Sequence, residues 1–289
     1  MNQKELRRNF ILLNVGYACH YADWNWKNIS SPFIRIHYVK KGTARIRRGG
    51  EEYELKEKHL YLTPSYVMQT YECDGTLELY YIHIYEEMGN DPSLFDLIRF
   101  PVEIESDSLL IQLIERLIEI NPDIELRQYD PQAYDNFPTI SDYIARQQVA
   151  SFVSDYETRG ILNQILSRFM IQASFKKENM EPRVLKSLYY IHENIDRPID
   201  IDCLAELCFL TKNHFIRLFK KEMHSTPGRY INRKKIEIAQ LRILVKNRTV
   251  KDTAYSLGFE NIPYFHRLFK KITGENPGEY KKKVTRNCV

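Results

Sequence analysis

The chain has 289 residues, of which 43% are hydrophobic and 28% are charged. Single hydrophobic cores usually stop growing below this length, so we expect two domains, and the composition excludes disordered and collagen-like chains. Residues 182–289 contain 22 Lys and Arg against 11 Asp and Glu, whereas residues 1–181 contain 20 against 27. Because surplus cations are useful against a phosphate backbone, the C-terminal half is expected to bind a polyanion.

Cysteine usage and hydropathy favour a protein of the reducing cytoplasm. The five cysteines are odd in number and form no CxxC pair, so neither a disulfide framework nor a zinc ribbon is indicated. No apolar run approaches the roughly 20 residues that a transmembrane helix needs. The short run Phe10–Leu13 follows a few basic residues, but Asn14 and Gly16 end it and no clean cleavage site follows. We therefore expect no signal peptide and no membrane partner.

Five short segments from Phe33 onward are rich in β-branched and aromatic residues and are separated by turn residues. They cover residues 33–39, 43–47, 52–55, 59–62 and 78–84. Segments of this length and composition predict antiparallel strands. We expect them to form a β-rich domain over residues 1–105.

Two helical patterns follow, over residues 107–120 and 140–175, and a stretch that contains three prolines joins them. Each pattern carries one apolar stripe. The stripes consist of Leu110, Leu113, Ile114, Leu117 and Ile118 in the first pattern and of Ile161, Ile165, Leu166, Phe169 and Met170 in the second. Residues 106–175 are therefore expected to form a helical segment, and the polar residues 176–182, closed by a proline, a linker.

An internal repeat marks the C-terminal half. Residues 202–230 and 252–280, compared at a shift of 50, are identical at 12 of 29 positions, among them Phe215/Phe265 and Arg217/Arg267. Composition alone would give roughly 2 identities, so the chain builds one supersecondary unit twice.

The second copy shows what the repeated unit is. Thr249 is placed to cap a helix over residues 250–257, and Gly258 ends it in the left-handed conformation. Asn261 is placed to cap the next helix, over residues 262–272, and Gly274 lies just beyond its end. Apolar residues in this second helix follow the i, i+3, i+4, i+7 pattern. The result is helix, tight turn, helix.

The first copy has the same signals, with Leu204 and Leu207 in the leading helix, Thr211 as a cap, and Phe215, Leu218 and Phe219 as a buried stripe. Residues 228–245 between the copies predict one long helix. A rigid spacer could hold two reading helices about one DNA turn, roughly 34 Å, apart. Such units also occur in protein-interaction modules, but two copies with arginines in equivalent places favour DNA.

Three stretches of the second copy carry a resemblance to a known family: Leu257–Phe259, Tyr264–Lys271 and Gly274–Tyr280. Residues 183–282 resemble the AraC/XylS transcription regulators. The resemblance implies a DNA-binding domain with two helix-turn-helix units, here residues 183–286, that binds double-stranded DNA sequence-specifically, and it leaves a contact with RNA polymerase open. One departure is Cys208, which stands where the second copy has Gly258, so we expect a relaxed turn there.

The resemblance also assigns residues to the DNA interface. Carried over position by position, base-reading roles fall on Asn213, Ile216, Arg217, Ile262, Pro263, Tyr264, His266 and Arg267. The resemblance places Lys212, Lys220 and Lys270 next to the DNA phosphates. An arginine in such a place can donate two hydrogen bonds to a guanine.

The N-terminal strands, with turns at Lys41-Gly42 and Gly49-Gly50, are similar to the cupin-like barrel of many members of this family. The resemblance implies an α+β multidomain chain: a barrel that binds a small-molecule effector, a helical segment that pairs two subunits into a homodimer, and an all-α DNA-binding domain. The effector positions fall near Lys27, Thr70, Tyr81 and His83, with Trp24 and Trp26 close by. These aromatic residues could equally fill the barrel, with His83 as a core histidine.

Catalysis is not expected. Cupin enzymes hold a metal with histidines and a carboxylate, but Met68 stands where the usual histidine after Pro64 would fall, and no HxH occurs. We therefore expect no metal, no cofactor and no enzyme activity. Three interpretations stay open: an effector-modulated regulator, a regulator whose barrel only dimerises, and a cupin-type enzyme fused to a DNA-targeting module. A stoichiometric metal would favour the last. The sequence identifies neither the effector nor the operator, and it does not separate activation from repression.

Overall fold

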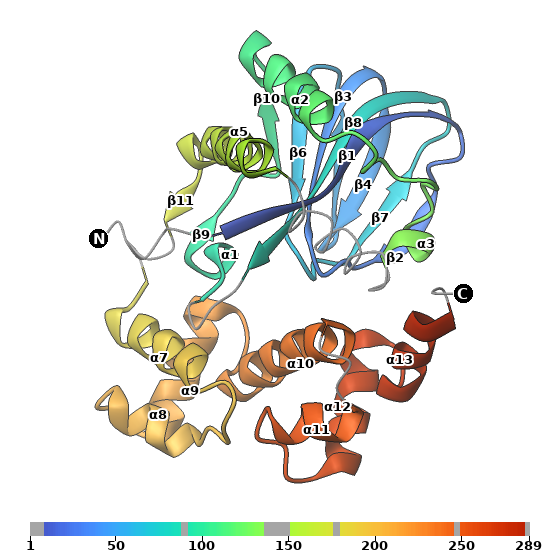
Figure 1. Cartoon of the computed structure of the whole chain (residues 1–289). Helices are drawn as coiled ribbons and strands as arrows, with labels where there is room; N and C mark the ends of the chain where they lie inside the picture. The colour runs from blue at the N-terminus through green and yellow to red at the C-terminus, as the bar shows by residue number, and fades with distance from the viewer. Residues whose placement is uncertain (1–8, 88–91, 136–150, 176–179, 246–248, 287–289) are drawn as a thin grey trace. The chain divides into compact units, whose positions relative to one another are not determined.

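A computed structural model describes residues 9–87, 92–135, 151–175, 180–245 and 249–286 (Figure 1). The contacts divide the chain into two compact units. Of the described residues, the β-rich unit comprises 9–87, 98–135 and 151–174, and the helical unit comprises 92–97, 175, 180–245 and 249–286. A short segment from the N-terminal half therefore belongs to the helical unit.

The β-rich unit contains two antiparallel sheets. One has the strand order β1-β8-β3-β6-β10 and the other β2-β7-β4-β5, and β11 and β9 form a separate pair. The strands are β1 (Asn9–Tyr21), β2 (Trp26–Ile29), β3 (Ile34–Gly42), β4 (Ala44–Arg48), β5 (Glu51–Leu55), β6 (His59–Thr63), β7 (Gln69–Glu72), β8 (Thr76–Glu87), β9 (Ile98–Arg99), β10 (Glu103–Glu105) and β11 (Ser174–Phe175).

Side chains from both sheets share one core. Val39 and Leu79 of the five-stranded sheet pack in the same cluster as Ile46 and Leu55 of the four-stranded sheet. The five strands expected from Phe33 onward are confirmed. Sequence analysis missed β1, whose 13 residues include Phe10–Leu13. Most of β1 is buried, so the strand lacks the alternation that reveals a half-exposed strand.

Two longer helices lie against β1. They are α2 (Ser108–Ile120) and α5 (Phe152–Ile171), and one turn, α3 (Pro131–Tyr134), lies between them in the chain. The Asp107 carboxylate accepts from the Leu110 amide at 2.8 Å and caps α2, which confirms the first expected helix. The second expectation is partly wrong, because Ser174–Phe175 is a strand. Residues 136–150 of that expectation lie outside the described residues.

The helical unit has two small cores with one long helix passing through both. Its helices are α1 (Leu94–Leu97), α7 (Pro182–Glu193), α8 (Ile201–Leu207), α9 (Lys212–Met223), α10 (Pro227–Val245), α11 (Val250–Tyr255), α12 (Ile262–Thr273) and α13 (Pro277–Arg286). Tyr230 of α10 packs with Phe215 and Phe219, whereas Ile236 of α10 packs with Phe265 and Phe269. The expected spacer helix is confirmed, and Figure 1 shows α10 running between the two helix pairs.

The segment from the N-terminal half gives the helical unit a buried carboxylate. Asp96 of α1 accepts from the Tyr230 hydroxyl at 3.0 Å and lies 3.0 Å from the Lys234 ammonium. Burial opposes ionisation, but Lys234 and His192 lower the pKa of Asp96 below its ordinary value. Lys234 also lies 3.1 Å from Glu237. Asp96 is thus part of an internal network of charges.

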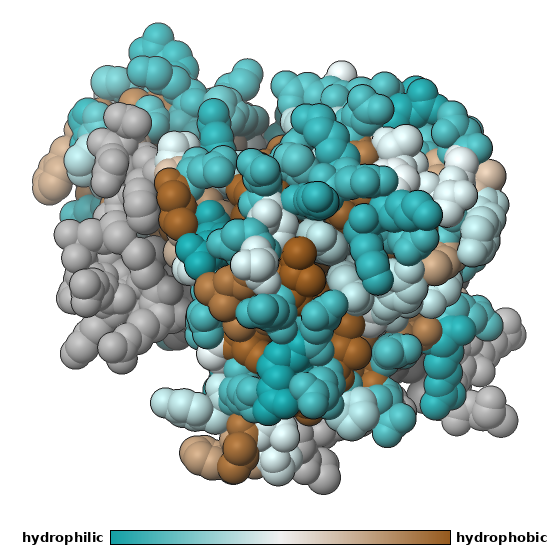
Figure 2. All heavy atoms as spheres, turned by 90° about the horizontal axis from the view of Figure 1, so that it is seen from above, coloured by the Kyte–Doolittle hydropathy of each residue, from teal (hydrophilic) through white to brown (hydrophobic). Residues whose placement is uncertain are grey.

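Hydrophobic side chains reach the surface in small groups among hydrophilic ones on the face that Figure 2 shows. The most exposed large apolar side chains include Phe209 at 88% and Phe152 at 81%. Within the described ranges, no helix combines the length and the apolar character that crossing a bilayer requires.

Candidate nucleic-acid interface and barrel cavity

The turn of the second helix-turn-helix unit matches its sequence signals. Thr249 accepts from the Asp252 amide at 3.0 Å and caps α11, and Asn261 accepts from the Tyr264 amide at 2.8 Å and caps α12. Gly258 has φ +70, and the Phe259 amide donates to the Ala254 carbonyl at 3.0 Å. This arrangement is a Schellman end, in which a left-handed residue lets the chain turn back on the helix.

The turn of the first unit is shifted by one residue. Cys208 has φ −92 and ends α8, and Phe209 takes the left-handed conformation with φ +56. Leu210 then donates to the Ala205 carbonyl at 2.9 Å and packs on the core, in the role that Phe259 has in the second unit. The expected relaxation of the turn at Cys208 therefore takes the form of a longer α8. Thr211 begins α9 as expected, but its side chain makes no capping hydrogen bond.

The predicted interface residues occupy matching places on α9 and α12. Asn213, Ile216, Arg217 and Lys220 of α9 correspond, at the shift of 50, to Pro263, His266, Arg267 and Lys270 of α12. Their i, i+3, i+4, i+7 spacing places each set on one helix face. All are exposed except Ile216, which is half-buried. Phe215, Phe219, Phe265 and Phe269 bury the opposite faces.

Both arginines on these faces are available to a partner. Within the described parts of the chain, no hydrogen bond or ion pair engages Arg217 or Arg267. Three other predicted residues are held by neighbours: Lys212 lies 2.7 Å from Asp202, Tyr264 accepts from the Asn232 amide at 3.0 Å, and Ile262 packs on the second core. Unlike these three residues, the two guanidinium groups are not engaged by any described neighbour.

The β-rich unit encloses a small cavity lined by histidine and aromatic side chains. About 20 Å³ is open to the centre of a water-sized sphere, which is room for about one water. The lining residues include Trp24, His37, Tyr81, His83 and Tyr134. Burial, reinforced by Arg35, lowers the pKa of His37 to about 3 and that of His83 well below its ordinary value. Both imidazoles are therefore neutral at pH 7.

A buried ion pair lies beside this cavity and contacts Tyr134, one of the lining residues. The Arg35 guanidinium is 2% exposed and lies 2.5 Å from the Asp135 carboxylate. It also donates to the Tyr134 hydroxyl at 2.7 Å and to Ser31. Although burial opposes its charge, Asp135 and Tyr134 raise the pKa of Arg35 overall.

The structure separates the six predicted effector residues. Trp24, Tyr81 and His83 line the cavity, and Trp26 packs edge-on against Trp24 with ring centroids 6.4 Å apart. Lys27 does not join them. It lines a separate open hollow of about 260 Å³ together with Asn25 and Arg45.

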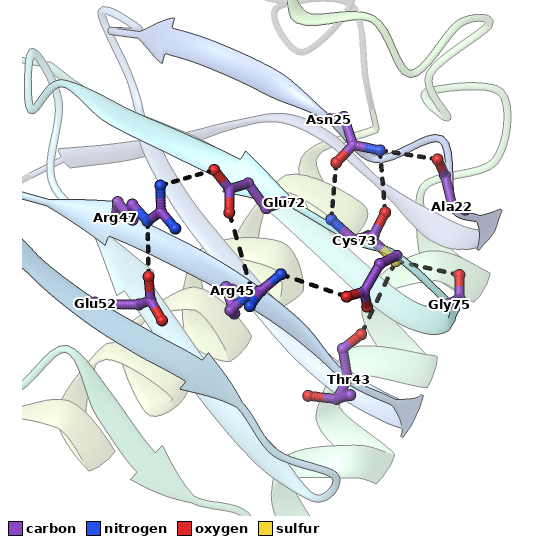
Figure 3. Close-up of polar contacts among 10 residues, drawn as sticks. Ala22, Asn25, Thr43, Arg45, Arg47, Glu52, Glu72, Cys73 and Gly75 are labelled. Atoms are coloured by element: carbon purple, nitrogen blue, oxygen red, sulfur yellow. Dashed lines mark hydrogen bonds and ion pairs between the residues drawn. The ribbon is translucent and has the colours of Figure 1, made fainter.

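Thr70 is also absent from the cavity lining, and its hydroxyl accepts from the Asn28 amide at 3.2 Å. Figure 3 shows polar contacts of Asn25, Arg45 and Glu72, three of the residues that line the hollow together with Lys27. Arg47 lies 2.7 Å from Glu52 and 3.1 Å from Glu72 across the strands of the four-stranded sheet. The predicted positions therefore fall in two different surroundings.

Sequence analysis missed His37, which lines the cavity, and the buried pair Arg35 and Asp135 beside it. A signal for the first two was present. Arg35 and His37 alternate with apolar residues in β3, so they share one face of the strand. They pair with His83 and Tyr81 of β8, two residues that were predicted. Asp135 lies a hundred positions away, and its contact depends on the tertiary fold.

No group of three or more histidine, cysteine, aspartate or glutamate side chains that could hold a metal occurs in the described part of the chain. Met68, which stands where cupin enzymes have a metal-binding histidine, is 59% exposed.

Residues 14–129 match a family model described as an AraC-like ligand binding domain, and residues 204–283 match a helix-turn-helix domain. The β-rich and helical units thus define a regulator with a ligand-binding domain and a DNA-binding domain. The chain belongs to the AraC family of DNA-binding transcription regulators.

Among curated relatives, the chain is similar to YfiF of Bacillus subtilis, an uncharacterized HTH-type transcriptional regulator, with 21% identity over 93% of this chain and 84% of YfiF. The regulatory protein SoxS of Salmonella typhimurium is 28% identical over 33% of this chain and 89% of SoxS. AdaA of Bacillus subtilis, a bifunctional transcriptional activator and DNA repair enzyme, is 33% identical over 32% of this chain, and the match spans 44% of AdaA.

Among solved structures, apo ToxT from Vibrio cholerae is similar with a TM-score of 0.50 at 12% identity, covering 96% of this chain and all of ToxT. At this identity the likeness concerns the fold alone.

Proposed function

We propose that this protein is an effector-modulated transcription regulator of the cytoplasm that reads double-stranded DNA through α9 and α12 and has no enzyme activity. The carrying observation is the repetition of one exposed face on both helices, each with an unengaged arginine at the same place, Arg217 and Arg267. Two cationic helices joined by α10 fit successive major grooves on one side of a duplex. A contact with RNA polymerase accords with this role.

The arginines are expected to supply base discrimination. Each bidentate contact with a guanine is worth about 1 to 3 kcal/mol, so replacing both arginines by alanine should weaken specific binding at least about thirtyfold. The measurement is a mobility-shift titration with the DNA upstream of the protein's own coding sequence. Arg229 and Lys251, which are exposed outside α9 and α12, provide a control variant with the same change of charge. Equal losses in the two double variants would mean that only net charge matters and would contradict the assigned readout.

We infer that two copies pair through the start of α5. Phe152, Val153 and Tyr156 are 81%, 72% and 72% exposed, and their i, i+1, i+4 spacing places them on one side of the helix. A group of large apolar side chains at this level of exposure favours a protein partner. A homodimer would present two DNA-binding domains to a longer operator.

The β-rich unit is proposed to bind the effector in the cavity beside Trp24, Tyr81 and His83. The alternative in which it only dimerises predicts that no small molecule changes its melting temperature, since a ligand of the native state raises that temperature. The enzyme alternative predicts a stoichiometric metal in the purified protein.

A further inference from the structure

One segment of the β-rich unit covers the cavity. Residues 124–135, here called the mouth strap, supply Leu126, Tyr129 and Tyr134 to its lining. The Leu126 amide donates to the Tyr81 hydroxyl at 2.8 Å, and the Tyr129 hydroxyl donates to the Tyr17 carbonyl at 3.2 Å. Asp135 holds the far end of the strap through Arg35 and Ser31.

The covered cavity is too small for an organic effector. Its 20 Å³ holds about one water, whereas ligand pockets typically measure about 300 to 1,000 Å³. Any larger molecule must displace lining side chains. Tyr134 stacks on His83 with ring centroids 5.4 Å apart, and it is the neighbour of Asp135 in the chain. Moving Tyr134 out of the cavity therefore pulls on the carboxylate that neutralises Arg35.

Displacement of Asp135 sets a condition on the ligand. Arg35 is buried, and a buried charge that loses its partner is strongly destabilising. A neutral molecule that opened the strap would leave that cation alone. A ligand that brings its own negative charge would restore the pair, so the site selects for an anion.

The surroundings of Arg35 suit a second carboxylate. Both ring nitrogens of His83 and Nδ1 of His37 are buried without a hydrogen-bond partner among the described residues. A neutral imidazole has one N–H to donate, so each histidine can bind a carboxylate oxygen next to the guanidinium. The Oδ1 atom of Asp135 also finds no partner in the described residues, and burial raises the pKa of this carboxyl despite Arg35. Asp135 is therefore an imperfect occupant of the site.

We propose that the effector is an organic carboxylate whose carboxylate group replaces that of Asp135 on Arg35 and thereby releases the mouth strap. This inference rests on the proposed effector role of the β-rich unit. The aromatic side chains of Trp24, Tyr81 and Tyr129 would surround the remainder of the ligand. Asp135 acts as a competitor carried by the chain itself.

Tryptophan emission of the full chain gives a direct assay. The protein has two tryptophans, Trp24 in the cavity lining and Trp26 packed against it. The probes are phenylacetate and its neutral analogue phenylacetamide, which share size and ring. Asp135→Asn removes the competing charge and leaves Arg35 unpaired. In this variant phenylacetate is expected to bind at least about tenfold more tightly than in the wild type, which corresponds to about 1.4 kcal/mol. Phenylacetamide should bind no more tightly.

A second variant separates the effect of the missing charges from an effect of misfolding. The double variant Arg35→Met with Asp135→Leu removes both charges together, a change that buried ion pairs often tolerate. It should keep the melting temperature near that of the wild type and lose the preference for phenylacetate. Two results would overturn the proposal: equal affinity of Asp135→Asn for both probes, or no emission change with phenylacetate up to about 10 mM, the weak end of small-ligand affinity. Neither result would bear on the proposed DNA binding. That function would instead be contradicted by an absence of binding in the mobility-shift assay.

Discussion

Gly258 in the turn before α12 provides a test of whether the second unit depends on the close contact of this turn with Arg197 and Pro198. Its φ of +70 is left-handed, and a Cβ atom there would lie 2.5 Å from the Arg197 carbonyl carbon and 2.6 Å from the Pro198 nitrogen. Alanine in this conformation costs about 1 to 2 kcal/mol, and overlap with packed backbone adds about 1 to 3 kcal/mol. Gly258→Ala should therefore lower the free energy of unfolding of the helical unit by about 2 to 5 kcal/mol.

Gly274 is the matched control, because it has φ +83 but no atom within 4 Å of a built Cβ. Gly274→Ala should cost the conformational part alone, about 1 to 2 kcal/mol. Urea unfolding separates the two units, since tryptophan emission reports the β-rich unit and far-ultraviolet circular dichroism reports mostly helices. Gly258→Ala should shift the helical transition and spare the emission transition. Equal shifts from the two variants, within about 0.5 kcal/mol, would refute the role assigned to the contact with Arg197 and Pro198.

Two further predictions concern the β-rich unit. The pKa of His37 falls from about 6.5 to about 3 on folding, so only the unfolded chain takes up a proton between these values and stability falls as the pH falls. Acidification from pH 7 to pH 5 should lower the free energy of unfolding by about 2 kcal/mol through His37, at 1.36 kcal/mol per pH unit below 6.5. Thermal melts of His37→Phe should therefore show a smaller pH dependence than those of the wild type. Phe152→Asp should shift the protein from dimer to monomer in sedimentation experiments, whereas an aspartate at the exposed Ser167 of the same helix should not; an unchanged dimer would place the interface elsewhere.

The helices of the repeat could be predicted because their signals are local. The caps Thr249 and Asn261 and the left-handed Gly258 and Gly274 are properties of neighbouring residues, and all four have the expected conformations. The matching faces of α9 and α12 follow from the spacing of the same residues. Local chemistry decides such features, so a sequence suffices.

The features that could not be predicted from the sequence depend on packing between distant residues. The alignment places Cys208 opposite Gly258, yet Phe209 takes the left-handed conformation because Leu210 supplies the apolar side chain that packs back on the core. A phenylalanine in this conformation is disfavoured on local grounds. Arg35 and Asp135 likewise meet only once the strap lies over the cavity. Their contact has no counterpart in a local pattern.

The Asp96 segment has a consequence for how the chain would respond to cleavage. The chain leaves the β-rich unit after Glu87, returns at Ile98, and leaves again near Ser174. A single cut between Phe175 and Met180, within the expected linker, would therefore give an N-terminal fragment that still carries Asp96, and a C-terminal fragment that still carries Tyr230 and Lys234. The nicked protein is expected to stay together as a non-covalent complex, and the two halves, produced separately, to complement each other.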